Sequence, residues 1–289
     1  MAVITGMTGA LWWAAAASPA ASAQAVSQPA AGRAIRAAAA GPAPLVRDVG
    51  PAGGKQGLGA PAMSLPMLQV NAERQVRALQ FVRTLRQKGS PDLKCTRRPC
   101  RAGLPAARDL RPTQQAQVRG YYCGPATVSE MLAQLGKRVS QATAARELRT
   151  NPSGTNWSDN SGYPVPAVLN LNQKKNNYVA VALPWYPTSR QITTFEADLV
   201  TDVNHNGGVP LAGNAYEVAG GPHLVGSPVS QTIFHWFEIR GYQKFGAVTD
   251  YEDSVHGAPS IGWSVAVPAY SSMPSSAIVD ILGARGYDW

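Results

Sequence analysis

Apolar residues in the second half of the chain follow first a helical and then a strand-like spacing. Between residues 123 and 135 they recur every three to four positions, and Gly136 follows, which predicts a helix that ends at this glycine. Further helices are predicted at 140–149, 164–176, 194–203 and 275–282, and strands at 178–183, 209–215, 235–242, 247–255 and 263–268. Helices dominate the first part and strands the second. This order favours an α+β fold in which a helical part packs on an antiparallel sheet.

Cys123 stands at the start of the first of these helices. The backbone N–H groups of a first helical turn have no partner within the helix, and together with the helix dipole they favour a thiolate there. Gly124 allows other atoms to approach closely, and Pro125 suits the first helical turn. The motif indicates a nucleophilic cysteine, with a buried core thiol as the alternative.

His235 opens a predicted strand among large hydrophobic residues. A lone histidine in such a position is more often structural, but a cysteine nucleophile needs a base or an imidazolium partner. The other histidines, His205, His223 and His256, lie in segments rich in Asn, Gly or Pro that are typical of loops. We therefore expect His235 to be the partner of Cys123.

A third residue should orient the imidazole, and two acids lie on the following strand. The strands are joined by the four-residue turn 243–246, which predicts a hairpin. If the turn is centred near Lys244, His235 lies opposite position 253. Asp250 then lies opposite position 238, roughly 10 Å further along at ~3.3 Å per residue. Successive side chains alternate between faces, so only one acid shares the face of His235. Asp253 is the expected partner, with Asp250 as the alternative.

Gln117 lies six positions before Cys123. Its side-chain amide is placed to help the Cys123 backbone N–H bind the oxyanion that develops during acyl transfer. Gln114 and Gln115 are also nearby, so the position alone does not single out Gln117.

These motifs resemble those of the papain-like bacteriocin-processing peptidases, which remove double-glycine leaders, and in particular their stand-alone exported relatives in actinobacteria. The resemblance rests on Gln117 and on the runs 122–126, 235–242 and 251–254, and it covers about residues 110–289. Two departures stand out. Ser254 follows the acid where the relatives often have proline, and the sequence contains no Gly-x-x-x-x-Gly-Lys-Ser/Thr loop of an ATP-binding cassette.

The resemblance implies a papain-like cysteine peptidase fold and assigns a role to each candidate residue. Cys123 would be the nucleophile, His235 the base, Asp253 the orienting acid and Gln117 the oxyanion residue. The substrate would be a peptide or a protein, and the protein would act as a monomer.

The front of the chain differs in composition from the rest. Residues 1–65 are rich in Ala, Pro and Gly, and a short apolar run at 10–17 is followed by Ala21-Ser22-Ala23, which fits a signal-peptide cleavage site although no Lys or Arg precedes the run. We expect a signal peptide at 1–23 and a linker or pro-segment with one short helix at 24–109. The peptidase domain is expected at 110–289, and the protein is expected to be secreted or associated with the cell wall.

Charge is divided in the same way. Up to Arg119 there are 16 Lys and Arg against 4 Asp and Glu, whereas from Gly120 onward there are 10 against 13. The basic front segment suits contact with an anionic surface such as the cell wall, with a solvated linker as the alternative. It lacks the interleaved aromatic residues of a stacking platform, so nucleic acid is not an expected partner.

The remaining cysteines, Cys95 and Cys100, are five positions apart around Pro99. In an exported protein this spacing is compatible with a small disulfide loop. Two cysteines without a nearby histidine cannot complete a zinc site, and no metal or organic cofactor is expected.

Three functions fit these observations. The first is a thiol hydrolase that cleaves peptide or isopeptide bonds through an acyl-enzyme. The second is an acyl transferase or cross-linking enzyme on the same fold. The third is a non-catalytic module that binds the cell wall or surface.

Overall fold

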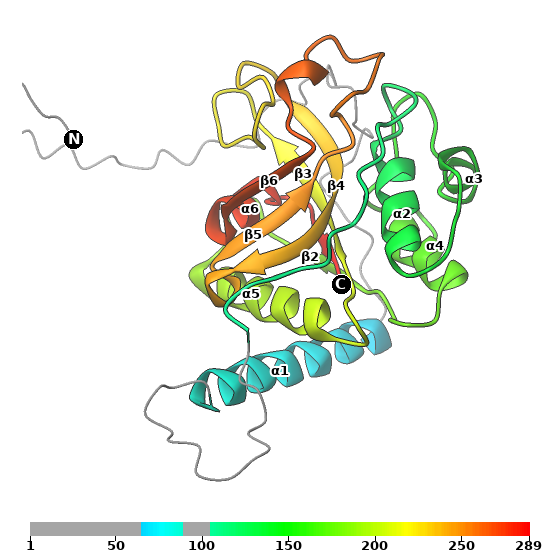
Figure 1. Cartoon of the computed structure of the whole chain (residues 1–289). Helices are drawn as coiled ribbons and strands as arrows, with labels where there is room; N and C mark the ends of the chain where they lie inside the picture. The colour runs from blue at the N-terminus through cyan, green and yellow to red at the C-terminus, as the bar shows by residue number, and fades with distance from the viewer. Residues whose placement is uncertain (1–64, 89–104) are drawn as a thin grey trace, which may run out of the picture. The chain divides into compact units, whose positions relative to one another are not determined.

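The computed structural model describes residues 65–88 and 105–289 (Figure 1). The helices are α1 (Leu65–Lys88), α2 (Cys123–Gln134), α3 (Gln141–Glu147), α4 (Pro164–Asn172), α5 (Ser189–Asn204) and α6 (Ser275–Ile281), and two short 3-10 segments are η1 (Lys244–Gly246) and η2 (Ser264–Ala266). No helix in these ranges is both long and apolar enough to cross a membrane.

A seven-stranded antiparallel sheet forms the centre of the fold. Its strands are β1 (Arg108–Asp109), β2 (Ala180–Ala182), β3 (Leu211–Glu217), β4 (Ile233–Gln243), β5 (Val248–Glu252), β6 (Tyr270–Pro274) and β7 (Gly286–Asp288). The order is β2-β7-β3-β4-β5-β6, and β1 pairs with the end of β4. β4 is thus bordered by β3 and β5, so its residues lie in the middle of the sheet.

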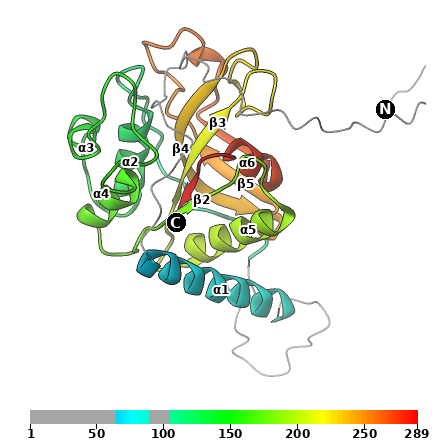
Figure 2. The same cartoon turned by 180° about the vertical axis from the view of Figure 1, so that it is seen from behind.

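Helices cover both faces of this sheet (Figures 1 and 2). On one face Phe195 and Leu199 of α5 pack with Phe237 of β4, and on the other Met131 of α2 packs with Trp236. Trp236 and Phe237 are neighbours in the sequence, and successive strand residues point to opposite faces. Burial of both faces explains why large apolar side chains occur on both faces of β4. The expected α+β fold, with helices packed on an antiparallel sheet, is confirmed.

Most predicted elements are present, but the predicted strand at 263–268 is wrong. That segment contains η2 and a loop, and the strand that pairs with β5 is β6. Val267 and Trp263 pack with Val255 and Ile261 in a small apolar cluster of their own, so their hydrophobicity reflects loop packing and not a place in the sheet. The short strands β1 and β7 were not predicted.

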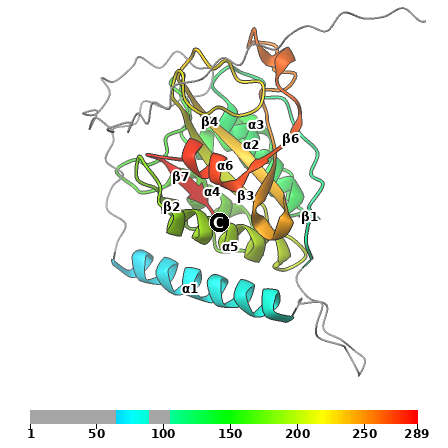
Figure 3. The same cartoon turned by 90° about the vertical axis from the view of Figure 1, so that its left-hand side faces the viewer.

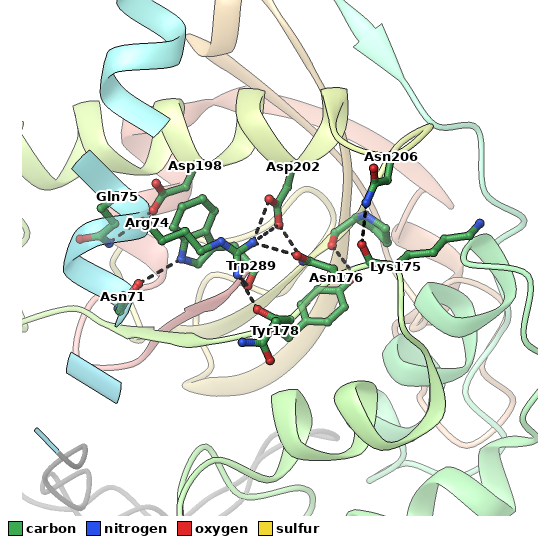
Figure 4. A network of polar contacts seen from close by, with 12 residues as sticks. Asn71, Arg74, Gln75, Lys175, Asn176, Tyr178, Asp198, Asp202, Asn206 and Trp289 are labelled. Carbon is green, nitrogen blue, oxygen red and sulfur yellow. Dashed lines mark hydrogen bonds and ion pairs between the residues drawn. The ribbon is translucent and has the colours of Figure 1, made fainter. Parts of the chain in front are cut away.

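Helix α1 packs against α5 through a network of polar contacts centred on Arg74 (Figure 4). Arg74 Nη2 lies 3.0 Å from Asp202 Oδ1 on α5, and its guanidinium lies 4.1 Å from the centre of the Trp289 ring. Asn176 Nδ2 donates a second hydrogen bond to Asp202, at 3.0 Å. Burial raises the pKa of Asp202 to about 6, although the positive charge of Arg74 acts in the opposite direction. The ion pair therefore compensates a buried carboxylate that would otherwise lack a charged partner.

The folded unit thus includes residues that precede the expected domain start near residue 110. Both α1 and β1 contact the sheet-and-helix body, the latter as a strand. Within α1, Ala78 and Val82 are buried, whereas Val76 is 53% exposed. Helix α1 lies at the end of the sheet opposite the loops that join β3 to β4 and β5 to β6 (Figures 1 and 3). This part of the front segment does not cover the start of β4.

Replacement of Arg74 tests whether this network anchors α1. We expect Arg74→Ala to lower the free energy of unfolding by about 2–3 kcal/mol at pH 8, because it leaves the buried Asp202 carboxylate without its charged partner. Loss of Arg74 raises the folded-state pKa of Asp202 further above its unfolded-state value. The variant therefore keeps its stability at low pH, where Asp202 is protonated, and loses it as the pH rises and Asp202 must ionise. The difference between the variant and the natural sequence should be smaller at pH 5. Urea unfolding at both pH values measures it.

Arg77→Ala is the matched control. Arg77 lies on the same helix, is 67% exposed and pairs at 3.9 Å with Glu73, so its loss should cost less than about 0.5 kcal/mol. Equal effects of the two substitutions would contradict the anchoring role of Arg74.

Candidate active site

Cys123 is the first residue of α2, and its side chain is completely buried. Tyr122 is the N-cap residue of α2, and its side chain makes no capping hydrogen bond. It therefore does not compete for the N–H groups at the start of the helix. Thr155 packs directly over the next residue: a methyl group on Gly124 would lie 2.3 Å from Thr155 Oγ1. Glycine is therefore required at this position, which agrees with the close approach predicted from the sequence.

The structure brings His235 and Asp253 together. His235 Nε2 lies 2.9 Å from Asp253 Oδ1, and both side chains are 2% exposed. Asp253 directly follows β5, and its Oδ1 also accepts a hydrogen bond of 2.8 Å from the backbone N–H of Val255. Asp250 lies elsewhere: it pairs in register with Gly241 and accepts hydrogen bonds from other side chains. Asp253, and not Asp250, is the acid that contacts the imidazole.

Electrostatics around His235 favour the imidazolium form. Burial by itself lowers the pKa of His235, but the charge of Asp253 and its hydrogen bond raise the pKa well above its usual value. Interactions with the Cys123 side chain act in the same direction. The environment thus stabilises a positive charge beside the sulfur, which is the condition for a thiolate–imidazolium pair.

Gln117 is buried and is held against the segment that carries Asp253. Its backbone N–H donates to Ser254 O at 2.8 Å, and its Oε1 accepts from Ser254 Oγ at 3.2 Å. Its Nε2 donates to Arg119 O at 2.8 Å. These contacts fix which way the amide points. Ser254, the residue that departs from the resembled pattern, takes part in two of them, and a proline there would lack the hydroxyl that donates to Gln117 Oε1.

The other histidines make structural contacts. Both ring nitrogens of His223 lie within 2.9 Å of backbone carbonyl oxygens, and His256 Nδ1 lies 2.7 Å from Val267 O. His205 is the C-cap residue of α5. The prediction that His235 is the histidine beside Cys123 agrees with these positions.

Glu217 is a residue near the site that sequence reasoning missed. It ends β3, is completely buried, and accepts a hydrogen bond of 3.1 Å from the backbone N–H of Leu224. Burial raises its pKa to about 7, while the charge of His235 lowers it. The signal was absent from the sequence, because only the β3–β4 pairing, in which Ala215 lies opposite His235, brings Glu217 near.

All four predicted residues are buried. Cys123 and Gln117 are 0% exposed, and His235 and Asp253 are 1% exposed. Cys123 shares its apolar surroundings with Trp157, among other side chains. The site described by the structure is therefore closed around its reactive atoms.

One group of described residues has metal-ligating geometry, and it lies outside the Cys–His–Asp group. It consists of the buried glutamates Glu130, Glu238 and Glu252. Cys95 and Cys100, whose spacing is compatible with a disulfide, lie outside the described residues, as does the predicted signal peptide.

A thiol at the start of a buried helix, next to an imidazole that is paired with a carboxylate on an antiparallel sheet, is the arrangement of papain-like cysteine peptidases, and this chain is one. The model of the Peptidase_C39 like family matches residues 108–261, just over half of the 289 residues. The chain therefore belongs to this family, and thiol peptidase activity follows from that membership.

Solved structures and curated proteins add less. The crystal structure of xylellain, a cysteine protease from Xylella fastidiosa, is similar with a TM-score of 0.37 and 14% sequence identity, over 64% of this chain and 85% of that chain. No curated protein matches the sequence.

The pairing of His235 with Asp253 leads to a prediction about protonation. We expect Asp253→Asn to lower the pKa of His235 by at least about one pH unit, because the carboxylate that favours the imidazolium is gone and burial favours the neutral ring. An NMR pH titration of the imidazole resonances measures this. Asp250→Asn is the control and should leave the pKa of His235 unchanged. An equal decrease in both variants would show that Asp253 has no special role.

Proposed function

We propose that this protein is an exported thiol hydrolase that cleaves peptide or isopeptide bonds through Cys123, His235 and Asp253. The observation that carries the proposal is the buried hydrogen bond between His235 and Asp253 beside the Cys123 sulfur, in surroundings that favour the imidazolium. Membership of the Peptidase_C39 like family supports the same class of reaction.

The reaction then proceeds in two stages. The Cys123 thiolate attacks the substrate carbonyl carbon, and the resulting oxyanion is bound by the Cys123 backbone N–H and the side-chain amide of Gln117. The His235 imidazolium transfers its proton to the leaving amine as the C–N bond breaks, which leaves a thioester on Cys123. Neutral His235 next takes a proton from water, the hydroxide attacks the thioester, and the carboxylic acid and the thiolate–imidazolium pair are released. Asp253 keeps the imidazole oriented throughout.

Burial of the four side chains means that peptide access requires a more open conformation than the one described. Thr155 packs against Gly124 at the start of α2, and Trp236 Nε1 donates to Thr155 O at 3.1 Å. The segment around Thr155 is therefore the covering element that we expect to move. The same burial favours a second candidate function, a non-catalytic binding module in which the fold persists without turnover.

Export and surface contact are part of the proposal. Residues 10–23 have the pattern of a signal peptide, and the front segment is basic. An exported peptidase would meet peptide or protein substrates outside the cytoplasm, and the basic front segment would bring it to an anionic cell wall. The motifs around Cys123 and His235 resemble those of the stand-alone, exported type of bacteriocin-processing peptidase, which supports this part of the proposal.

Cys123→Ala tests the mechanism directly. We expect it to reduce cleavage of a fluorescent casein substrate at least about a thousand-fold, because no other group replaces the nucleophile. Cleavage by the natural sequence and by the variant is compared at equal concentration, and circular dichroism shows that the variant is folded. Measurable turnover by the Ala variant would contradict the role of Cys123.

Chemical labelling separates the two candidate functions. In a Cys95→Ala, Cys100→Ala background, a thiol-directed electrophile should modify Cys123 at pH 5 as well as at pH 7, detected by mass spectrometry, because the thiolate is paired with an imidazolium. Labelling that disappears at pH 5, together with no cleavage, would identify a binding module. An added amine that is recovered as a conjugate would identify acyl transfer.

Gln117 and Ser254 give a second catalytic prediction. Gln117→Ala should reduce kcat by about 10²–10³-fold with little change in KM, because an oxyanion donor acts mainly in the transition state. Ser254→Ala should reduce kcat by about 2- to 10-fold, the value of one hydrogen bond that orients the amide. The double variant should be no slower than Gln117→Ala alone, since Ser254 acts through Gln117. Additive losses in the double variant would show that Ser254 has a separate role.

A further inference from the structure

A second layer of acidic side chains lies on the same three elements that carry the candidate catalytic residues. Glu130 is on α2 with Cys123, Glu238 is on β4 with His235, and Glu252 is the last residue of β5, directly before Asp253. One carboxylate oxygen from each lies within 4.8 Å of the others, and the three residues are at most 1% exposed. The mechanism uses none of them.

The oxygens of this cluster lack the partners that buried carboxylates normally have. Both oxygens of Glu238 and both of Glu252 are buried and accept no hydrogen bond from an N–H or hydroxyl group of the described residues, and neither does Glu130 Oε2. Glu238 and Glu252 can hydrogen-bond to each other, but only by sharing a proton. Glu130 Oε1 accepts a hydrogen bond of 2.6 Å from the backbone N–H of Gln115. Glu238 and Glu252 lie directly opposite each other in the β4–β5 register, so their side chains point to the same face.

The positive charge of Arg240 does not neutralise the three carboxyl groups of this cluster. Arg240 lies two residues after Glu238 on β4 and interacts with both Glu238 and Glu252 through its charge, but its Nη1 is bound to Asp109. Burial raises the pKa of Glu252 to about 7 and those of Glu130 and Glu238 well above the usual range. Three buried carboxyl groups at this separation need either protons or a cation.

We propose that Glu130, Glu238 and Glu252 form a Ca²⁺ site that links α2 to the β4–β5 hairpin. An all-carboxylate donor set suits a hard cation, and each of the three glutamates offers one oxygen to the cluster. Ca²⁺ takes six to eight oxygen ligands in flexible geometry, so the remaining positions would be filled by second carboxylate oxygens or water. Mg²⁺ fits less well, because it retains several water molecules and the ligand atoms here are buried. The orphaned oxygens of Glu238 and Glu252 aim into the cluster and would become ligands.

A cation bound by the three glutamates would fix α2 relative to the β4–β5 hairpin, and with them the candidate catalytic residues that these elements carry. Helix α2 supplies Cys123 and Glu130, which are seven residues or about two helical turns apart, and the hairpin supplies the other residues of both groups. Glu130 also lines a surface hollow of about 680 Å³ together with Gln115 and Ser129, which offers a route for the ion.

Thermal unfolding with and without Ca²⁺ tests this proposal without using peptidase activity, so it fails or succeeds independently of the proposed function. The full chain is dialysed against about 1 mM CaCl₂, the same concentration of MgCl₂, or EDTA. We expect Ca²⁺ to raise Tm by about 5–10 °C if its concentration is a hundred times the dissociation constant, and Mg²⁺ to raise it by less than half as much. Elemental analysis after removal of unbound Ca²⁺ should find one ion per chain.

Glu238→Gln should abolish the Ca²⁺-dependent rise in Tm, and so should Glu252→Gln. If the Glu238→Gln protein does not fold, the test uses Glu252→Gln. Glu217→Gln is the matched control: Glu217 is also a buried glutamate of the sheet with a raised pKa, but it lies outside the cluster, so the Ca²⁺ response should persist. The proposal is overturned if Tm is the same in Ca²⁺ and EDTA and no Ca²⁺ is bound. In that case the cluster holds protons instead. A full Ca²⁺ response in Glu238→Gln, or an equal response to Mg²⁺, would also overturn it.

Discussion

The hydrogen bond between His235 and Asp253 is the interaction on which the proposed chemistry of this protein depends. It is 2.9 Å long and nearly inaccessible to solvent, so neither group can exchange its partner for water. Its geometry requires that β4 and β5 pair in one register and that the chain turn immediately after β5, where Val255 N also binds Asp253. Breaking this pair would leave a charge buried alone at a cost of several kcal/mol. The hairpin and the charge pair therefore stabilise each other.

Helix α2 packs against the same hairpin, and this contact places Cys123. Both faces of the sheet are covered by helices, and α2 packs on β4 through residues such as Met131 and Trp236. That apolar contact positions the start of α2, and with it Cys123, next to the end of β4 that carries His235. Burial of so many acidic groups beneath this contact is unfavourable, and the two apolar cores on either side of the sheet offset it. The candidate catalytic residues thus lie where α2 packs on the centre of the sheet.

A closed site and a catalytic role are compatible only if the site opens. The segment around Thr155 packs against Gly124 at the start of α2 and is bound by Trp236 of β4, whereas α1 lies at the other end of the sheet (Figure 1). Loops at the sheet edge can move at lower cost than the helices and strands that hold the reactive groups. A rigid set of catalytic elements beneath a movable cover would combine exclusion of water with access for a peptide.

Local sequence patterns were enough to predict the helix that begins at Cys123, the β4–β5 hairpin, and the choice of His235 and Asp253. The predicted register placed position 250 opposite 238, whereas Glu252 lies there. This shift of two residues preserves which face each side chain points to, so the acid expected beside His235 is also the one that contacts it. The tertiary structure alone decided the Ser254–Gln117 contact, the burial of the site and the acidic cluster. Helical spacing and turns are set by neighbours in the sequence, but the contacts that α2 makes with β4 and β5 join residues about a hundred positions apart, which no local pattern encodes.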